Sequence, residues 1–185
     1  FARPGPRVAE GVELLAHLAR CRLMTGRPEA ARAVTTRALA LPRENAVLLD
    51  SLGVVLTRLD EQALAIELFD QAIEMQPAMP SLYFNRALAQ RLFGQLAGAE
   101  RDLEKCVALN PGHGKAHWAL AEMLPRGPVD NHVARLRAQL ELSTPGSLQE
   151  EMLSLALFRE LDDLARYEEA WPELERGVAC RRARS

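Results

Sequence analysis

The sequence predicts an all-α protein, a solenoid of about five antiparallel helix hairpins, and two observations carry that prediction. First, Ala and Leu dominate the 185 residues while aromatic residues make up only 5%, and such a composition favours closely packed helices over strands. Second, small side chains return every 34 residues, an interval typical of a repeat made of two helices. With 48% hydrophobic and 26% charged residues, the chain has the composition of a folded domain.

The 34-residue period appears in several aligned positions. Small residues occupy the clearest one, at Ala19, Gly53, Ala87 and Ala121. The same interval relates Ala31, Ala65, Ala99 and then Val133, as well as Ala38, Ala72, Cys106 and then Leu140. Small side chains let two helices of a hairpin approach closely. A bulky residue at Gly53 is therefore expected to separate its pair.

Turn residues divide the chain into helices. Gly26 and Pro28 end one helix and start the next, Gly94 breaks the third pair, and residues 110–112 form a turn, in keeping with the preference for Pro at helix starts and Gly after helix ends. Helices are expected at 8–25, 28–41, 45–59, 62–75, 80–93, 97–109, 114–124, 129–142, 148–164 and 167–182.

The last two hairpins are less regular than the first three. Residues 125–128 interrupt the fourth, and residues 143–147 lengthen the following connection, so that the period slips from 34 to 37. Phe158 stands where a small residue is expected, which bears on how closely the last pair can pack. The sequence is accordingly divided into an N-terminal extension (1–7), a regular array (8–124) and degenerate hairpins that continue the same solenoid (125–185).

Residues 46–79 resemble the tetratricopeptide pattern. The positions of the pattern are occupied by Leu49, Leu52, Gly53, Leu56, Ala65, Phe69, Ala72 and Pro77, with Leu in place of the usual aromatic residues at 49 and 56. The next unit has Tyr83, Asn85, Ala87, Ala99, Leu103, Cys106 and Pro111, and it departs from the pattern at Arg86 and Gln90, where Leu and Tyr are usual. The resemblance implies a right-handed superhelix whose first helices line a concave groove, and a protein–protein interaction scaffold that binds a peptide or protein segment there.

Carrying the family pattern over places a set of first-helix side chains on the groove. In the first two units these are Glu13, Ala16, Arg20, Leu23, Met24, Val47, Asp50, Val54, Thr57 and Arg58. The predicted peptide-binding residues are Arg20, Arg58, Phe84, Asn85, Leu88, Arg91, Lys115 and Trp118. An apolar strip with basic margins suits an acidic and apolar segment. The alternative is that Phe84 and Trp118 are core residues, because aromatic residues at helical spacing are often buried.

One class of tetratricopeptide domain grips the C-terminal tail of cytosolic chaperones with five polar contacts. The corresponding positions here are Asp50, Val54, Asn85, Lys115 and Ala119. Only Asn85 and Lys115 suit that role, and a carboxylate at Asp50 would repel the tail. We therefore expect no chaperone-tail binding.

Other classes of function find little support in the sequence. A net charge of −2 argues against nucleic acid as a partner, and no apolar run is long enough for a membrane span. Three widely spaced cysteines argue against a disulfide framework and favour a reducing, cytoplasmic location. His113 and His117 have the spacing of a metal pair but lack a third ligand, so we expect neither a metal nor a cofactor.

No catalytic motif is present either, so the chain by itself is not expected to be an enzyme. The acidic pairs at 162–163 and 168–169 are expected at a solvated helix corner, and the arginines at 181, 182 and 184 at a helix end favoured by the macrodipole.

The C-terminal third also resembles the tetratricopeptide half of bacterial tetratricopeptide-sulfotransferase proteins, over residues 129–184. Residues 130–136 and 161–171 and the Arg-rich last helix carry this resemblance. It implies an alternative function, the non-catalytic arm of a larger sulfotransferase that positions an acceptor or a partner. Self-association into a homo-oligomer stays open in both readings.

Overall fold

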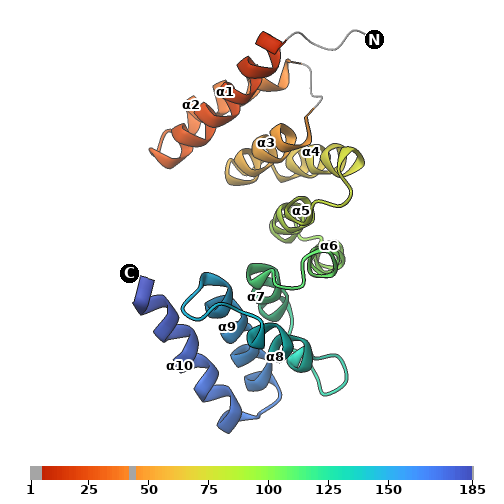
Figure 1. Cartoon of the computed structure of the whole chain (residues 1–185). Coiled ribbons are helices and arrows are strands. Elements are labelled where there is room, and N and C mark those ends of the chain that lie inside the picture. The colour runs from red at the N-terminus through yellow and green to blue at the C-terminus, as the bar shows by residue number, and fades with distance from the viewer. Residues whose placement is uncertain (1–5, 42–44, 185) are drawn as a thin grey trace. The chain divides into compact units, whose positions relative to one another are not determined.

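The computed structural model describes residues 6–41 and 45–184, and it describes the side chains of all of these except residues 6–10 and 12. Within these ranges the chain forms ten α-helices and no strand (Figure 1). They are α1 (Pro6–Met24), α2 (Pro28–Leu39), α3 (Ala46–Arg58), α4 (Gln62–Met75), α5 (Pro80–Leu92), α6 (Leu96–Leu109), α7 (Gly114–Met123), α8 (Val133–Glu141), α9 (Leu148–Asp163) and α10 (Tyr167–Arg184). The all-α class is confirmed, and every expected helix is present. Residues 1–5 of the predicted extension lie outside the described residues.

The largest boundary difference is at α8, which begins at Val133, four residues later than predicted. Polar side chains stabilise a turn in front of it. The Gly127 backbone N–H donates to Asp130 Oδ1 at 2.8 Å, and Asn131 Nδ2 donates to the Pro128 carbonyl at 2.9 Å. Asp and Asn side chains commonly compete with helical hydrogen bonding in this way.

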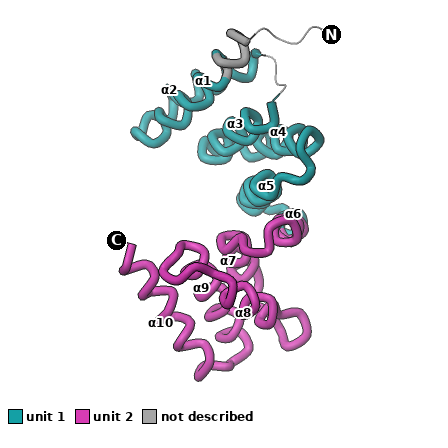
Figure 2. Tube along the Cα trace, viewed as in Figure 1, with its two compact units in different colours: residues 1–99 teal, residues 100–185 magenta. Residues whose placement is uncertain are grey.

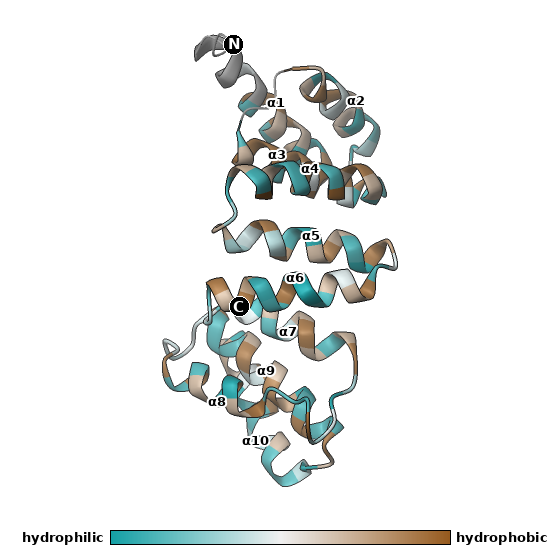
Figure 3. Cartoon of the chain, turned by 90° about the vertical axis from the view of Figure 1, so that its right-hand side faces the viewer, coloured by the Kyte–Doolittle hydropathy of each residue, from teal (hydrophilic) through white to brown (hydrophobic). Residues whose placement is uncertain are grey.

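The chain divides into two compact units, residues 1–99 and residues 100–185 (Figure 2). Each unit has its own core, and the helices carry both hydrophobic and hydrophilic residues along their lengths (Figure 3). The boundary between residues 124 and 125 in the sequence analysis separates regular from irregular repeats, which is a different property from compactness, and it stays a prediction. No helix of the described chain is both long and apolar enough to cross a membrane.

In the first unit, α1 packs with α2 and α3 packs with α4 as hairpins. A Cβ atom placed on Gly53 of α3 would lie 2.7 Å from Cε1 and Cζ of Phe69 on α4. Phe69 is completely buried, as are Leu49 and Ala65 of the same core. Gly53 is therefore small because the Phe69 ring occupies the space where a side chain would lie.

In the second unit, α9 packs against α7, α8 and α10. The close approach of α9 and α10 occurs at Gly177, where a Cβ would lie 2.9 Å from Cγ and Cδ2 of Leu155. Phe158, which the sequence analysis singled out, packs partly buried at the edge of the core. The last pair is thus accommodated by a glycine on α10, not by a small residue at position 158.

Buried carboxylates join the helices of the second unit. Glu151 is 2% exposed and pairs with Arg181, whose Nε lies 2.8 Å from Oε1, and with Arg184. Glu160 is 1% exposed and accepts from the backbone N–H of His132 and, at 2.7 Å, from its Nδ1. Arg181 and Arg184 therefore compensate a buried charge on α9, beyond the macrodipole role expected from sequence.

One residue of each acidic pair at the α9–α10 corner has a side-chain partner. The side chain of Asp163 is 8% exposed and accepts from the Arg126 backbone N–H at 3.3 Å, so the expectation of a solvated surface is wrong for this residue. Glu169 receives hydrogen bonds from Arg166 and from Arg137. These arginines lower the pKa of Glu169 to about 2.

Candidate functional site

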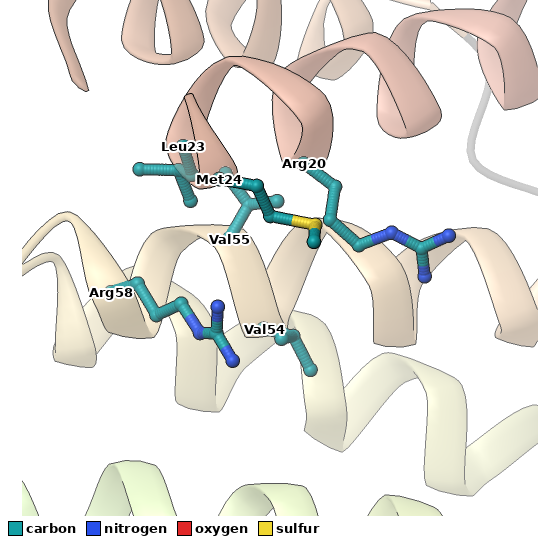
Figure 4. A pocket seen from close by; sticks show the side chains of 6 residues that line it. All are labelled: Arg20, Leu23, Met24, Val54, Val55 and Arg58. Carbon is teal, nitrogen blue, oxygen red and sulfur yellow. The ribbon is translucent and has the colours of Figure 1, made fainter. Parts of the chain in front are cut away.

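A pocket of about 410 Å³ opens on the first unit between α1 and α3. It is called the α1–α3 pocket, and Figure 4 shows the side chains that line it, Arg20, Leu23, Met24, Val54, Val55 and Arg58. Its volume lies in the lower part of the range of ligand pockets. It has room for one or two apolar side chains of a bound segment.

Helix spacing explains why these residues meet. Arg20, Leu23 and Met24 lie three and four residues apart on the last turns of α1, and Val54 and Arg58 are four apart on α3. Residues at this spacing share one face of a helix. The corresponding faces of two neighbouring first helices thus form the two walls.

The apolar side chains that line the pocket differ in how far they are buried in the core. Val55 is 1% exposed and belongs to the packed interior, whereas Met24 is 74% exposed. Leu23 and Val54 are half-buried and pack at the edge of the cores of this unit. A flexible thioether over an aliphatic floor is a surface that can adapt to different apolar side chains.

Both arginines of the pocket are exposed. Arg20 Nη2 lies 3.3 Å from Nδ1 of His17. Among the described side chains, no carboxylate forms an ion pair with Arg20 or Arg58. The pocket therefore has two cationic margins that are available to a negatively charged ligand.

The next first helix, α5, carries four of the predicted residues. Phe84, Asn85, Leu88 and Arg91 are all half-buried. Asn85 Nδ2 donates to Oδ1 of Asp50 on α3 at 2.8 Å. Burial raises the pKa of Asp50, and the hydrogen bond from Asn85 lowers it in part. Asn85 is therefore engaged within the unit by a carboxylate.

The remaining two predicted residues lie on α7, in the second unit. Lys115 is exposed, and Trp118 is half-buried against the core that contains Leu153 and Leu157. The structure thus brings Arg20 and Arg58 together in one pocket and shows Trp118 contributing to a core. A ligand role for Phe84, Asn85, Leu88, Arg91, Lys115 and Trp118 stays a prediction.

Sequence reasoning gave no role to Val55, which closes the back of the α1–α3 pocket. The 3.6-residue period places it on the buried side of α3, and only the neighbouring position of α1 makes it a pocket residue as well. No signal in a single sequence distinguishes such a residue from the rest of the core.

The histidines singled out by their spacing have structural partners. Nδ1 of His113 accepts from the Ala116 backbone N–H at 3.1 Å and so caps α7. Nε2 of His117 donates to the Pro111 carbonyl at 2.8 Å, and burial lowers the pKa of His117. Over the described residues, no three His, Cys, Asp or Glu side chains are grouped to hold a metal ion.

Comparison with known proteins agrees with the helical-hairpin architecture. Residues 80–113 match the family model described as tetratricopeptide repeat. Human tetratricopeptide repeat protein 36 is 42% identical over 73 residues, which are 40% of this chain and 39% of that protein. The match thus spans well under half of that relative's length.

Solved structures show the same fold at low sequence identity. A putative kinesin light chain from Podospora anserina, with nearly identical tetratricopeptide-like repeats, has a TM-score of 0.72 at 19% identity and covers 92% of this chain and 94% of its own. The second tetratricopeptide domain of human RPAP3, in complex with the HSP70 peptide SGPTIEEVD, has a TM-score of 0.52 at 22% identity and covers 60% of this chain and 97% of its own. Residues 80–113 are therefore a tetratricopeptide repeat, and the chain has the helical-hairpin fold of tetratricopeptide repeat proteins.

Proposed function

We propose that this chain is an interaction scaffold whose first unit binds a segment of a partner protein in the α1–α3 pocket. The observation that carries the proposal is the pairing of two exposed arginines, Arg20 and Arg58, with an apolar floor that includes Met24 and Val54. The apolar floor would receive one or two side chains of the ligand. Arg20 and Arg58 would then pair with carboxylates of the ligand that flank those apolar side chains.

The ligand we propose is an internal segment in which apolar and acidic residues alternate. The second tetratricopeptide domain of RPAP3 is in complex with the HSP70 peptide SGPTIEEVD, but a chaperone C-terminal tail is not proposed as a ligand for this chain. Asn85 donates a hydrogen bond of 2.8 Å to Asp50, and the family pattern would set the Asp50 carboxylate against the carboxylate of such a tail. An internal segment has no terminal carboxylate and avoids this repulsion.

Fluorescence anisotropy with labelled peptides tests the proposal. The probe is a peptide of about ten residues that alternates Leu or Phe with Asp or Glu, and we expect a Kd of about 10–100 μM. One comparison peptide carries Lys in place of every acidic residue, and another carries Ser in place of every apolar residue. Both are expected to bind at least about tenfold more weakly, because each removes one half of the complementarity.

Substitutions in the protein locate the site. Exposed ion pairs contribute about 0.2–1 kcal/mol each, so Arg20→Ala with Arg58→Ala is expected to weaken binding by about tenfold. Val54→Glu is expected to abolish it, because it places a carboxylate on the apolar floor. Arg101→Ala, at an exposed arginine of α6, serves as the matched control and is expected to leave affinity unchanged. Equal binding of the Lys peptide, or unchanged binding by the double variant, would contradict the proposal.

The narrower resemblance of residues 129–184 to bacterial tetratricopeptide-sulfotransferase proteins stays a prediction, as does a cytoplasmic location. Under that reading the same pocket would position a partner or acceptor for a separate catalytic domain. Reading the parent gene tests it. A phosphate-cradling strand–loop–helix encoded beyond Ser185 would support the reading, and a stop codon there would end it.

A further inference from the structure

The open face of α3 continues beyond the α1–α3 pocket to a carboxylate. Asp50, Val54 and Arg58 follow one another at intervals of four residues, so they lie along one face of the helix. Val54 and Arg58 line the pocket, whereas Asp50 lies one helical turn before Val54, on the side away from Arg58. A rise of about 1.5 Å per residue sets the Cα atoms of Asp50 and Arg58 about 12 Å apart.

The neighbouring first helix, α1, has the same order of charges. Glu13 precedes Arg20 by seven residues, which again places both on one face. Two contacts show that α1 and α3 run in the same direction. At one end, Asn45, which caps the N-terminus of α3, donates from Nδ2 to Oε1 of Glu13 at 3.2 Å. At the other end, the last turns of both helices meet in the pocket. Each helix therefore carries a carboxylate nearer its N-terminus and an arginine nearer its C-terminus.

The carboxylate of Asp50 is the one that lacks a charged partner. It is half-buried, and among the described side chains no lysine or arginine pairs with it. Its hydrogen bond comes from the neutral amide of Asn85, at 2.8 Å. Burial raises the pKa of Asp50, and the hydrogen bond from Asn85 lowers it only in part. A carboxylate has room for about four hydrogen bonds, so Asp50 can accept further donors, and a cationic donor would compensate its charge best.

We infer that the ligand of the α1–α3 pocket is a dipolar segment, in which a basic residue that pairs with Asp50 and an acidic residue that pairs with Arg58 flank the apolar residue on the pocket floor. This inference rests on the proposed function and adds the chemistry of the residue on the Asp50 side. A carboxylate there would be repelled, whereas Lys or Arg would donate to Asp50. In an extended segment, residues four apart span about 13 Å, which matches the separation of Asp50 and Arg58.

Fluorescence anisotropy of the full chain with four labelled peptides tests the inference. Each peptide has about ten residues and one central Leu, and it differs from the others only at the two positions that lie two residues before and two residues after this Leu. These positions carry Glu and Glu, Lys and Lys, Lys and Glu, or Glu and Lys. One of the two mixed peptides is expected to bind about fivefold more tightly than the Glu-Glu peptide. Which of the mixed peptides binds better reports the direction in which the segment lies.

Substitution of Asp50 identifies the group that recognises the basic residue. Asp50→Asn removes the charge but keeps the shape of the side chain. In this variant the mixed and Glu-Glu peptides are expected to bind within about twofold of each other, because the attraction for Lys and the repulsion of Glu are both lost. Glu74→Gln, at an exposed glutamate of α4, makes the same change in net charge and is expected to keep the fivefold preference. Far-UV circular dichroism confirms that both variants are folded.

The outcomes separate this inference from the proposed function. If the Glu-Glu peptide binds, and Arg20→Ala with Arg58→Ala weakens it, but neither mixed peptide binds more tightly, the inference is wrong while the proposed function stands. A folded Asp50→Asn variant that keeps the full preference would also overturn the inference. If none of the four peptides binds, the proposed function fails and the inference fails with it. The comparison of the peptides on the wild-type chain requires no variant.

Discussion

Replacing Gly53 with alanine tests the packing on which the first unit depends. The new methyl group would lie 2.7 Å from two ring atoms of Phe69 and 3.1 Å from a third. That ring is completely buried, so it has little freedom to move away. Inserting a methylene-sized group into a packed core costs about 1–3 kcal/mol, while Gly→Ala inside a helix gains about 1 kcal/mol. The net expectation is a loss of about 1 kcal/mol in the free energy of unfolding.

Gly11 provides a matched control, because it also lies within a helix but a Cβ there would meet no heavy atom within 4 Å. Gly11→Ala is expected to stabilise the chain by about 0.5–1 kcal/mol. The clash itself is isolated by Phe69→Leu, which removes the contacting ring atoms. In the Phe69→Leu background, Gly53→Ala is expected to destabilise the chain much less than it does in the wild type. The double-mutant cycle should give a coupling energy between the two positions of about 1–2 kcal/mol.

Urea unfolding followed by two probes is the assay. Both tryptophans, Trp118 and Trp171, lie in the second unit, so their fluorescence reports that unit while far-UV circular dichroism reports the whole chain. Gly53→Ala is expected to shift the dichroism transition to lower urea more than the fluorescence transition. If Gly53→Ala stabilises the chain as Gly11→Ala does, the reasoning about close helix approach at this glycine is wrong.

Three further predictions follow from individual contacts. Asn45→Ala removes the cap of α3, where the side chain accepts from the Val47 N–H at 2.9 Å, and it is expected to cost about 1 kcal/mol in urea unfolding. Glu169 has a folded pKa of about 2 against an ordinary value of 4.5, so its ion pairs stabilise the fold above pH 4.5, and this contribution is lost as the pH falls from 4.5 toward 2. The difference in free energy of unfolding between the wild type and Glu169→Gln should therefore shrink between pH 4.5 and pH 2. A difference that stays constant over this range would contradict the assignment. Burial raises the pKa of the Cys106 thiol to about 11, so iodoacetamide at neutral pH is expected to modify the exposed Cys21 well before it modifies Cys106 in the folded chain, and equal rates measured by mass spectrometry would argue against that burial.

The period of small residues, together with Gly and Pro at the turns, was enough to predict the helices and their pairing in the first unit. Gly53 and Ala65 recur in register because helix approach distance depends on the smallest side chain at the contact. The second unit shows where this reasoning stops. There the close contact is made by Gly177 against Leu155, outside the repeat pattern, and the late start of α8 results from side-chain hydrogen bonds made by Asp130 and Asn131.

Long-range charge pairing was also beyond the sequence. The sequence of the Arg-rich end of α10 indicates only a helix terminus. In the structure, Arg181 and Arg184 form ion pairs with the buried Glu151 of α9, which is about 30 residues earlier in the chain. By contrast, the face that carries Arg20 and Arg58 could be placed from helical spacing together with the tetratricopeptide pattern. Their common pocket depends only on two adjacent first helices, whereas Lys115 and Trp118 lie in the other unit.

Methyl NMR of the full chain during titration with the acidic–apolar peptide tests the central claim most directly. The proposed α1–α3 pocket predicts that the methyl signals of Leu23, Met24 and Val54 shift progressively and saturate. The signals of Leu157, buried in the second unit, should stay in place. Saturation with these three pocket signals unmoved would contradict the account.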